Sequence, residues 1–133
     1  MTWDSVEPAP VVLVTGTESL LAERAVDRVV ARARERDPEV EVSRIDGPGY
    51  EPGRLRSVAS PSLFGESTLV VLDDLHSATE AAFADVTDYV ADPDGDVVLV
   101  LVHGGGNRGK RVLDAVRASG AVLVPCEPVK KDA

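Results

Sequence analysis

A phosphate-binding loop is the first piece of chemistry that the sequence suggests. Residues 104–110 read GGGNRGK, which matches the pattern G-x-x-x-x-G-K of loops whose backbone N–H groups cradle phosphates. The next residue is Arg111, where such a site needs a Ser or Thr hydroxyl to bind Mg²⁺. The loop also follows the fourth predicted strand, whereas nucleotide loops of this kind normally follow the first. We favour a flexible basic turn, and we keep as the alternative hypothesis a P-loop NTPase or kinase that uses Lys110 and Asp73.

The stretch after the first predicted strand is the usual place for a nucleotide loop. Residues 16–23 read GTESLLAE, so the second Gly, the Lys and the Ser/Thr of the pattern fall on Leu21, Ala22 and Glu23. Every functional position is replaced, and the two carboxylates in this stretch would repel a triphosphate even at a helix N-terminus. The sequence therefore predicts the fold of a nucleotide-binding protein in which the nucleotide site is degenerate. We predict no cofactor.

An acidic pair, Asp73-Asp74, follows the apolar run 69–72. Such a pair positions Mg²⁺ and water in ATPases of this type, but without a phosphate loop it has nothing to act on. We interpret the pair as capping the next helix, because Asp is a common helix starter.

Three further side chains could in principle do chemistry. His76 and His103 have no Cys or second His at ligand spacing, so we predict no metal site. Cys126 has no base beside it in the sequence, and we interpret it as a small buried or edge hydrophobe. We predict no catalytic residue.

An apolar pair, Leu63-Phe64, lies in a predicted connection between a helix and a strand. Such a pair usually belongs to the core. However, Pro61 and Gly65 bracket it, so neither helical nor strand periodicity fixes it inward, and Phe64 is one of only two phenylalanines. On pattern alone, core and interaction site both remain open.

The elements that position these residues alternate short apolar runs with longer amphipathic stretches. This alternation predicts an α/β domain with a five-stranded, mostly parallel sheet. The predicted strands are 11–15, 40–45, 69–72, 97–103 and 121–125. The predicted helices are 20–36, a short one after Pro52, 78–90 and 110–118. We expect 40–45 at an edge, because its apolar residues alternate, and 97–103 at the centre, because it is the most apolar.

Composition limits the classes of function. The 133 residues, 44% of them hydrophobic, fit one globular domain. The net charge of −9 opposes direct binding of nucleic acid, which needs a basic patch. The single Cys cannot form an internal disulfide, no signal-peptide pattern is present, and the longest apolar run, 97–102, is too short to span a bilayer. We expect a cytoplasmic protein.

Taken together, the motifs resemble the delta subunit of the bacterial DNA polymerase III clamp loader. The resemblance spans nearly the whole chain and rests on the order and spacing of its motifs. These are GTESLLAE (16–23), SPSLFG (60–65), TLVVL (68–72), YVADP (89–93), GKR (109–111) and VLVPCEPVKK (122–131).

The resemblance implies a three-layer, P-loop-NTPase-like (AAA+ clamp-loader) domain that binds no nucleotide. Such a domain does not hydrolyse ATP itself, although it belongs to the DNA polymerase III holoenzyme. In the family a Leu-Phe pair inserts into a hydrophobic pocket on the ring-shaped sliding clamp, and the match falls on Leu63 and Phe64. Ser62 and Gly65 belong to the same motif. The domain would promote ring opening for loading onto DNA during replication, while partner subunits do the chemistry.

The family also implies a domain organisation and partners. Its full-length protein continues into a lid and a collar domain. We therefore expect residues 1–128 to form the clamp-binding domain and 129–133 to begin the linker to a lid that is absent here, so that the chain is a fragment. The implied partners are the sliding clamp (beta subunit) and, in the full-length protein, the gamma/tau and delta prime subunits. From the net charge and the short apolar runs we expect little direct DNA binding by this domain and no membrane.

Overall fold

A five-stranded sheet organises the molecule, and every neighbouring pair of strands runs parallel. The computed structural model describes residues 2–59, 67–106 and 108–126. The strands are β1 (Val11–Thr15), β2 (Glu41–Asp46), β3 (Thr68–Asp73), β4 (Val97–His103) and β5 (Val122–Pro125), in the order β2-β3-β4-β1-β5. The α/β class and the five strands are confirmed, with β2 at an edge and β4 in the middle as predicted.

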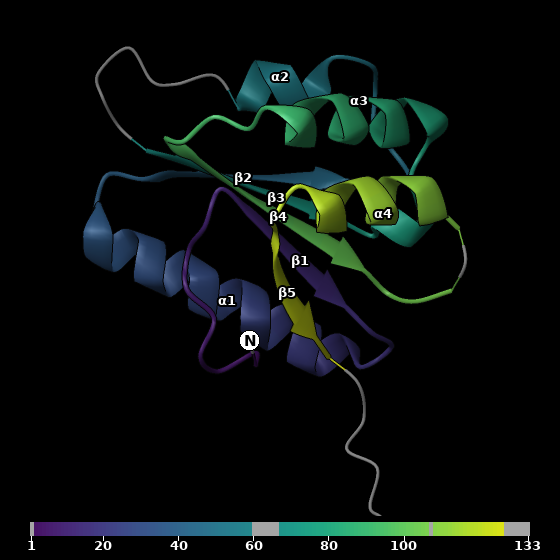
Figure 1. Ribbon diagram of the computed structural model, residues 1–133. Helices are drawn as coiled ribbons and strands as arrows, with labels where there is room; N and C mark the ends of the chain where they lie inside the picture. The colour runs from purple at the N-terminus through teal and green to yellow at the C-terminus, as the bar shows by residue number, and fades with distance from the viewer. Residues whose placement is uncertain (1, 60–66, 107, 127–133) are drawn as a thin grey trace, which may run out of the picture.

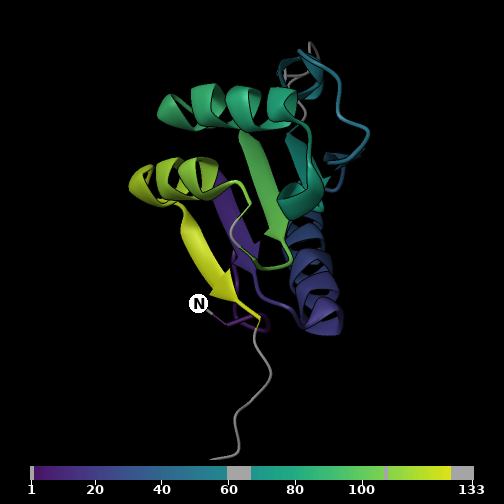
Figure 2. The same ribbon diagram turned by 90° about the vertical axis from the view of Figure 1, so that its right-hand side faces the viewer.

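The helices form a layer on each face of the sheet. They are α1 (Ser19–Arg36), α2 (Arg54–Val58), α3 (Glu80–Ala91) and α4 (Lys110–Ala118). The long helix α1 covers one face, and α2, α3 and α4 cover the other (Figures 1 and 2). A short 3-10 helix, η1 (Leu75–Ser77), precedes α3 and was not predicted. None of the helices in the described ranges is long and apolar enough to cross a membrane.

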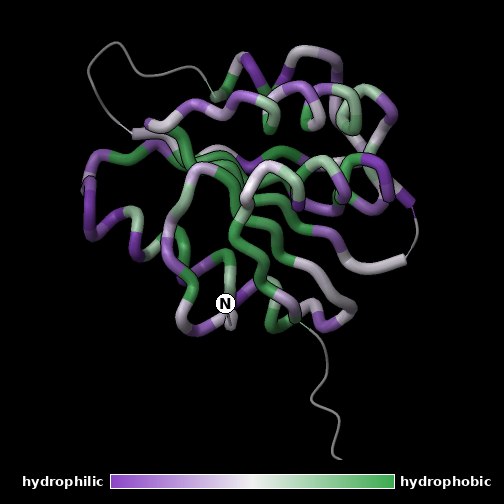
Figure 3. The backbone as a smooth tube through the Cα atoms, viewed as in Figure 1, coloured by the Kyte–Doolittle hydropathy of each residue, from purple (hydrophilic) through white to green (hydrophobic). Residues whose placement is uncertain are grey.

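Two apolar cores lie between the three layers. Alternate residues of each strand point to opposite faces of the sheet, so Leu13 and Leu99 belong to the core under α2, α3 and α4, whereas Val12 and Val100 belong to the core under α1. All four are fully buried. Strands β1, β3 and β4 are accordingly strongly hydrophobic and nearly continuously buried (Figure 3), as expected of a parallel sheet covered on both faces, whereas the edge strand β2 is mostly polar.

Because the strands are parallel, their carboxyl ends all lie at the same end of the sheet. The connections after β1, β3 and β4 therefore converge there, and this is where ligands bind in open α/β sheets. At the other end of the sheet β3 begins at Thr68, and residues 60–66, which precede it in the chain, lie outside the described residues.

Candidate functional site

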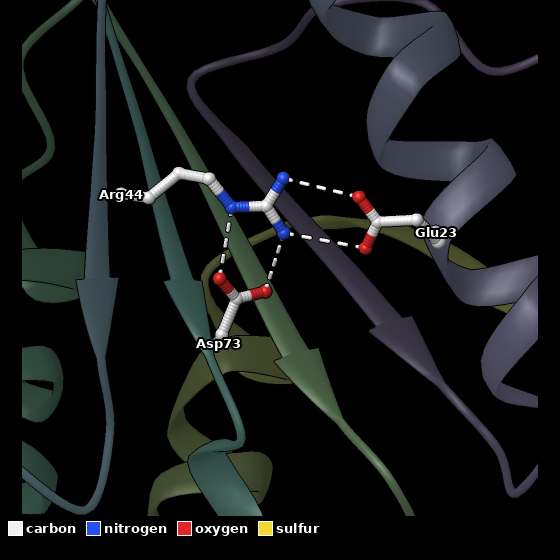
Figure 4. A network of polar contacts seen from close by, with 3 residues as sticks. All are labelled: Glu23, Arg44 and Asp73. Carbon is white, nitrogen blue, oxygen red and sulfur yellow. Dashed lines mark hydrogen bonds and ion pairs between the residues drawn. The ribbon is translucent and has the colours of Figure 1, made fainter.

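Arg44 is the centre of a polar network at the carboxyl ends of β2 and β3 (Figure 4). Its Nε and Nη2 donate to the two carboxylate oxygens of Asp73, both at 2.9 Å. Its Nη1 and Nη2 donate to the two carboxylate oxygens of Glu23, at 3.1 and 3.3 Å. These hydrogen bonds, first those with Asp73 and then those with Glu23, raise the pKa of the guanidinium. One side chain thus joins α1 to two strands.

The predicted capping role of Asp73 and Asp74 is wrong. The carboxylate of Asp73 binds Arg44, and Asp74, which has φ +53°, makes no side-chain hydrogen bond to cap η1. The next α-helix, α3, is capped by Thr79, whose Oγ1 accepts from the N–H of Ala82 at 3.3 Å. The inserted turn of 3-10 helix moves the start of α3 beyond the acidic pair.

The connection between β1 and α1 packs against the end of β5. The N–H of Glu18 donates to the carbonyl of Cys126 at 3.2 Å. Gly16 has φ +124°, and a Cβ there would lie 2.2 Å from the same carbonyl oxygen. Since α1 already begins at Ser19, residues 19–23 of this stretch are helical and only residues 16–18 form the connection. The loss of a nucleotide site in this stretch stays a prediction from the sequence. Cys126 itself is buried, as predicted.

The glycine-rich turn after β4 folds around two imidazoles. The N–H of Gly104 donates to Nδ1 of His76 at 2.8 Å, and the N–H of Gly105 donates to Nδ1 of His103 at 3.1 Å. Nε2 of His103 carries the ring proton, since Nδ1 is an acceptor, and donates to the carbonyl of Arg108 at 2.9 Å. Burial is the main reason that the pKa of His103 is lowered. Two amides that would hold a phosphate therefore bind side chains of the protein.

The same turn is fastened to the helical layer beside it. The Arg108 side chain donates to the carbonyl of Ala78, and its guanidinium lies over the ring of Phe83, 5.1 Å from the ring centre. Lys110 begins α4 and lines a groove between α3 and α4. Asn107 lies outside the described residues. The contacts made by the described part of this turn are those of a structural connection.

The clamp-binding residues expected from the family resemblance, Ser62, Leu63, Phe64 and Gly65, lie outside the described residues. The chain that leads into them is well anchored. The hydroxyl of Tyr50 donates to Oδ2 of Asp85 at 2.6 Å and accepts the N–H of Leu55 at 2.9 Å. The N–H of Gly53 donates to the same Asp85 oxygen at 2.8 Å. Burial, followed by the hydrogen bond to Asp85, raises the pKa of Tyr50 to about 12. These bonds fix α2 against α3.

The chain that leaves residues 60–66 is anchored as well. One carboxylate oxygen of Asp37 accepts the N–H of Ser67 at 2.9 Å, and the other accepts the N–H of Glu39 at 3.0 Å. The carbonyl of Ser67 accepts the N–H of Glu41 at 2.9 Å. The backbone bond from Ser67 is the main reason that the pKa of Asp37 is lowered. Both ends of the connection thus join a hydrogen-bonded framework.

Comparison with known proteins is informative at the level of structure. No family model matches the sequence, and no curated protein does. The structure is similar to that of the DNA clamp loader delta protein (YqeN) of Bacillus subtilis, with a TM-score of 0.67 and 18% sequence identity. The match covers 91% of this chain and 39% of that protein. The chain has a clamp-loader delta-like fold.

This delta-like fold explains where the sequence motifs lie. The connection after β1, Asp73 and the glycine-rich turn all lie at the carboxyl ends of the strands, where parallel α/β sheets bind ligands. Arg44 was missed in the sequence, because its partners are 21 and 29 positions away. The imidazole contacts of the glycine-rich turn were missed too, since His76 is 28 positions from Gly104. No local pattern indicates such distant pairs.

Proposed function

We propose that this chain is the clamp-binding domain of a delta-type clamp-loader subunit. It binds the sliding clamp of DNA polymerase III through Leu63 and Phe64, within the motif Ser62 to Gly65, and promotes ring opening when the clamp is loaded onto DNA. The observation that carries the proposal is the similarity of 91% of the chain to a protein described as a DNA clamp loader delta protein. The motif SLFG, between α2 and β3, supplies the contact residues.

An apolar pair suits this role energetically. Complete burial of one Leu and one Phe contributes about 1.5–3 kcal/mol each, and such residues dominate interfaces when they fill a preformed pocket. The anchoring of Ser67 by Asp37 and of α2 by Tyr50 supports the proposal, because a fixed stem reduces the ordering cost of binding. Ring opening follows if the domain binds the distorted clamp more tightly than the closed one.

The proposal extends to the organisation of the protein. Residues 1–128 form the clamp-binding domain, and residues 129–133 begin a linker towards a lid domain. The other clamp-loader subunits, gamma/tau and delta prime, supply the ATP chemistry. This division of labour is supported by the glycine-rich turn, because the N–H groups of Gly104 and Gly105 donate to His76 and His103 and are thus already used within the protein.

Titration calorimetry with the sliding clamp of the same organism tests the proposal. The double variant Leu63→Ala/Phe64→Ala should bind at least about 100-fold more weakly, the loss expected for two buried apolar side chains. Leu20→Ala is the matched control, because Leu20, in the first turn of α1, is a 57% exposed leucine. This variant should bind the clamp like the wild type. Circular dichroism should show the same fold in all three proteins. Equal clamp affinity of the wild type and the double variant would rule out the proposed contact.

Titration with Mg-ATP separates this proposal from a P-loop NTPase or kinase. We expect no saturable heat from the wild type, because the glycine-rich turn uses two of its amides internally. Binding of Mg-ATP that disappears in Lys110→Ala, while Arg111→Ala retains it, would favour the nucleotide-binding alternative.

A further inference from the structure

The two partners of Arg44 occupy special positions for a fold of this type. In P-loop NTPases, a Ser or Thr at the end of the phosphate loop and an acidic residue at the end of a neighbouring strand hold Mg²⁺. In this chain the first position falls on Glu23 and the second on Asp73. Both carboxylates bind the same guanidinium.

We propose that the Arg44 guanidinium takes the place that Mg²⁺ has in nucleotide-binding proteins of this fold. A bound metal ion and nucleotide tie the first helix to the strand only while they are present. Arg44 ties α1 to β3 permanently, because the cation is part of the chain. This role is separate from clamp binding, which the proposed function assigns to Leu63 and Phe64.

The geometry supports a cation in a fixed position. Arg44 projects from the edge strand β2, and its guanidinium lies between the carboxylates of Asp73 on β3 and Glu23 on α1 (Figure 4). All four carboxylate oxygens accept hydrogen bonds from it, between 2.9 and 3.3 Å. Paired contacts of this kind are specific to the planar guanidinium and cannot be made by a single ammonium group.

The residues present do not fit a metal-nucleotide complex. Mg²⁺ in such sites is held by one or two protein ligands together with substrate phosphates. Here Glu23 stands where a hydroxyl would be needed, and its charge would oppose the phosphates. Asp73 has both oxygens bound by Arg44. The network therefore replaces the metal and excludes it.

A stabilising effect is expected even though the network is partly exposed. The side chains of Arg44, Glu23 and Asp73 are 42%, 52% and 28% exposed. Single exposed ion pairs contribute little, but bidentate pairs joined into a network are the exception. The network also connects elements far apart in the sequence, so its loss should loosen the start of α1 in particular.

The first test removes the cation. Arg44→Gln should lower the melting temperature by roughly 3–6 °C and make the amides in the first two turns of α1 exchange several-fold faster with deuterium. The melting temperature and exchange rates of Arg44→Lys should lie between those of the wild type and those of Arg44→Gln, since lysine keeps the charge without the paired contacts. Arg34→Gln, at an exposed arginine near the end of α1, is the control. An Arg44→Gln variant that melts and exchanges like Arg34→Gln would overturn the proposal.

The second test asks whether charge is the cause. In the Arg44→Gln background, Glu23 and Asp73 should repel each other, so adding Glu23→Gln should raise the melting temperature by roughly 1–3 °C. In the wild-type background the same change should lower it. Additive losses in the double variant would assign the effect to packing of the Arg44 stem and contradict the proposal.

The third test asks whether Mg²⁺ can bind between Glu23 and Asp73 once the guanidinium is removed. Millimolar MgCl2, compared with NaCl at equal ionic strength, should raise the melting temperature of Arg44→Gln but leave the wild type and Arg44→Gln/Glu23→Gln/Asp73→Asn unchanged. If Arg44→Gln gains no stability from Mg²⁺, or the wild type gains as much, the guanidinium does not stand in for the metal.

Discussion

Tyr50 and Asp85 are 35 positions apart in the chain, and the Tyr50 hydroxyl donates a 2.6 Å hydrogen bond to the Asp85 carboxylate. The same hydroxyl accepts the N–H of Leu55, and the carbonyl of Tyr50 accepts a hydrogen bond from the hydroxyl of Thr79. One tyrosine therefore joins the short helix α2 to α3. A five-residue helix cannot be stable by itself, so α2 depends on this contact.

Removal of the Tyr50 hydroxyl should destabilise the protein. Tyr50→Phe loses a hydrogen bond to a charged group and leaves the buried N–H of Leu55 without that acceptor, at a cost of about 1.5–3 kcal/mol in the free energy of unfolding. Urea denaturation followed by circular dichroism measures this loss. Thr87→Ala on the exposed face of α3 is the control and should change stability by less than about 0.5 kcal/mol. Equal stability of the two variants would show that the contact is dispensable.

Alkaline pH should destabilise the protein through the same tyrosine. Burial and the hydrogen bond to Asp85 raise the pKa of Tyr50 to about 12, whereas a tyrosine in the unfolded chain has a pKa of about 10. The unfolded chain therefore loses this proton first, and the stabilisation, complete below about pH 10, is lost as the pH rises towards about 12. The fall in the free energy of unfolding over this interval should be shallower in Tyr50→Phe. An identical pH dependence of the wild type and Tyr50→Phe would show that Tyr50 is not the group responsible.

Much of the fold could be predicted from the sequence, because it depends on local periodicity. The apolar runs of β1, β3 and β4 and the amphipathic pattern of α1 each reflect burial against a neighbouring layer. Helix α4 was predicted with its observed bounds, since Gly109 and Gly120 frame it. Helix α3 was predicted two residues too early, because the 3-10 turn at Leu75–Ser77 has no periodicity of its own.

The candidate site was less predictable, because its contacts join distant parts of the chain. The loss of the phosphate loop could be read from Leu21, Ala22 and Glu23, since a motif is a local property. The partners of Arg44 could not be predicted from the sequence, because the register of β2 against β3 decides which side chains meet at the end of the sheet. The role of Leu63 and Phe64 stays a prediction.

The glycine after β1 provides a test of the degenerate loop. Gly16→Ala would place a Cβ 2.2 Å from the Cys126 carbonyl oxygen at a φ of +124°, so the backbone just after β5 would have to move. We expect a loss of more than about 3 kcal/mol, or no folded protein. Gly120→Ala is the control, because its φ is +85° and no atom lies within 4 Å of the added Cβ. It should cost only about 1–2 kcal/mol. Equal losses in urea denaturation would show that the close approach to Cys126 does not matter.

Acid should open the glycine-rich turn after β4. The imidazole of His103 accepts the N–H of Gly105 at Nδ1 and donates to the carbonyl of Arg108 from Nε2, an arrangement that only the neutral ring can make. Burial, as the main cause, lowers the pKa of His103, whereas a histidine in the unfolded chain has a pKa of about 6.5. The unfolded chain therefore binds a proton at a pH where the folded protein does not.

It follows that the stabilisation by His103 is complete well above about pH 6.5 and decreases as the pH falls through that value and towards the lowered pKa of the folded protein. Urea denaturation at several pH values between about 8 and 5 should show this decrease, and hydrogen exchange should show faster loss of protection at the Gly105 amide. His103→Gln keeps a donor for the Arg108 carbonyl but does not titrate, so its stability should depend less on pH. A wild type and a His103→Gln variant with the same slope would exclude His103 as the titrating group.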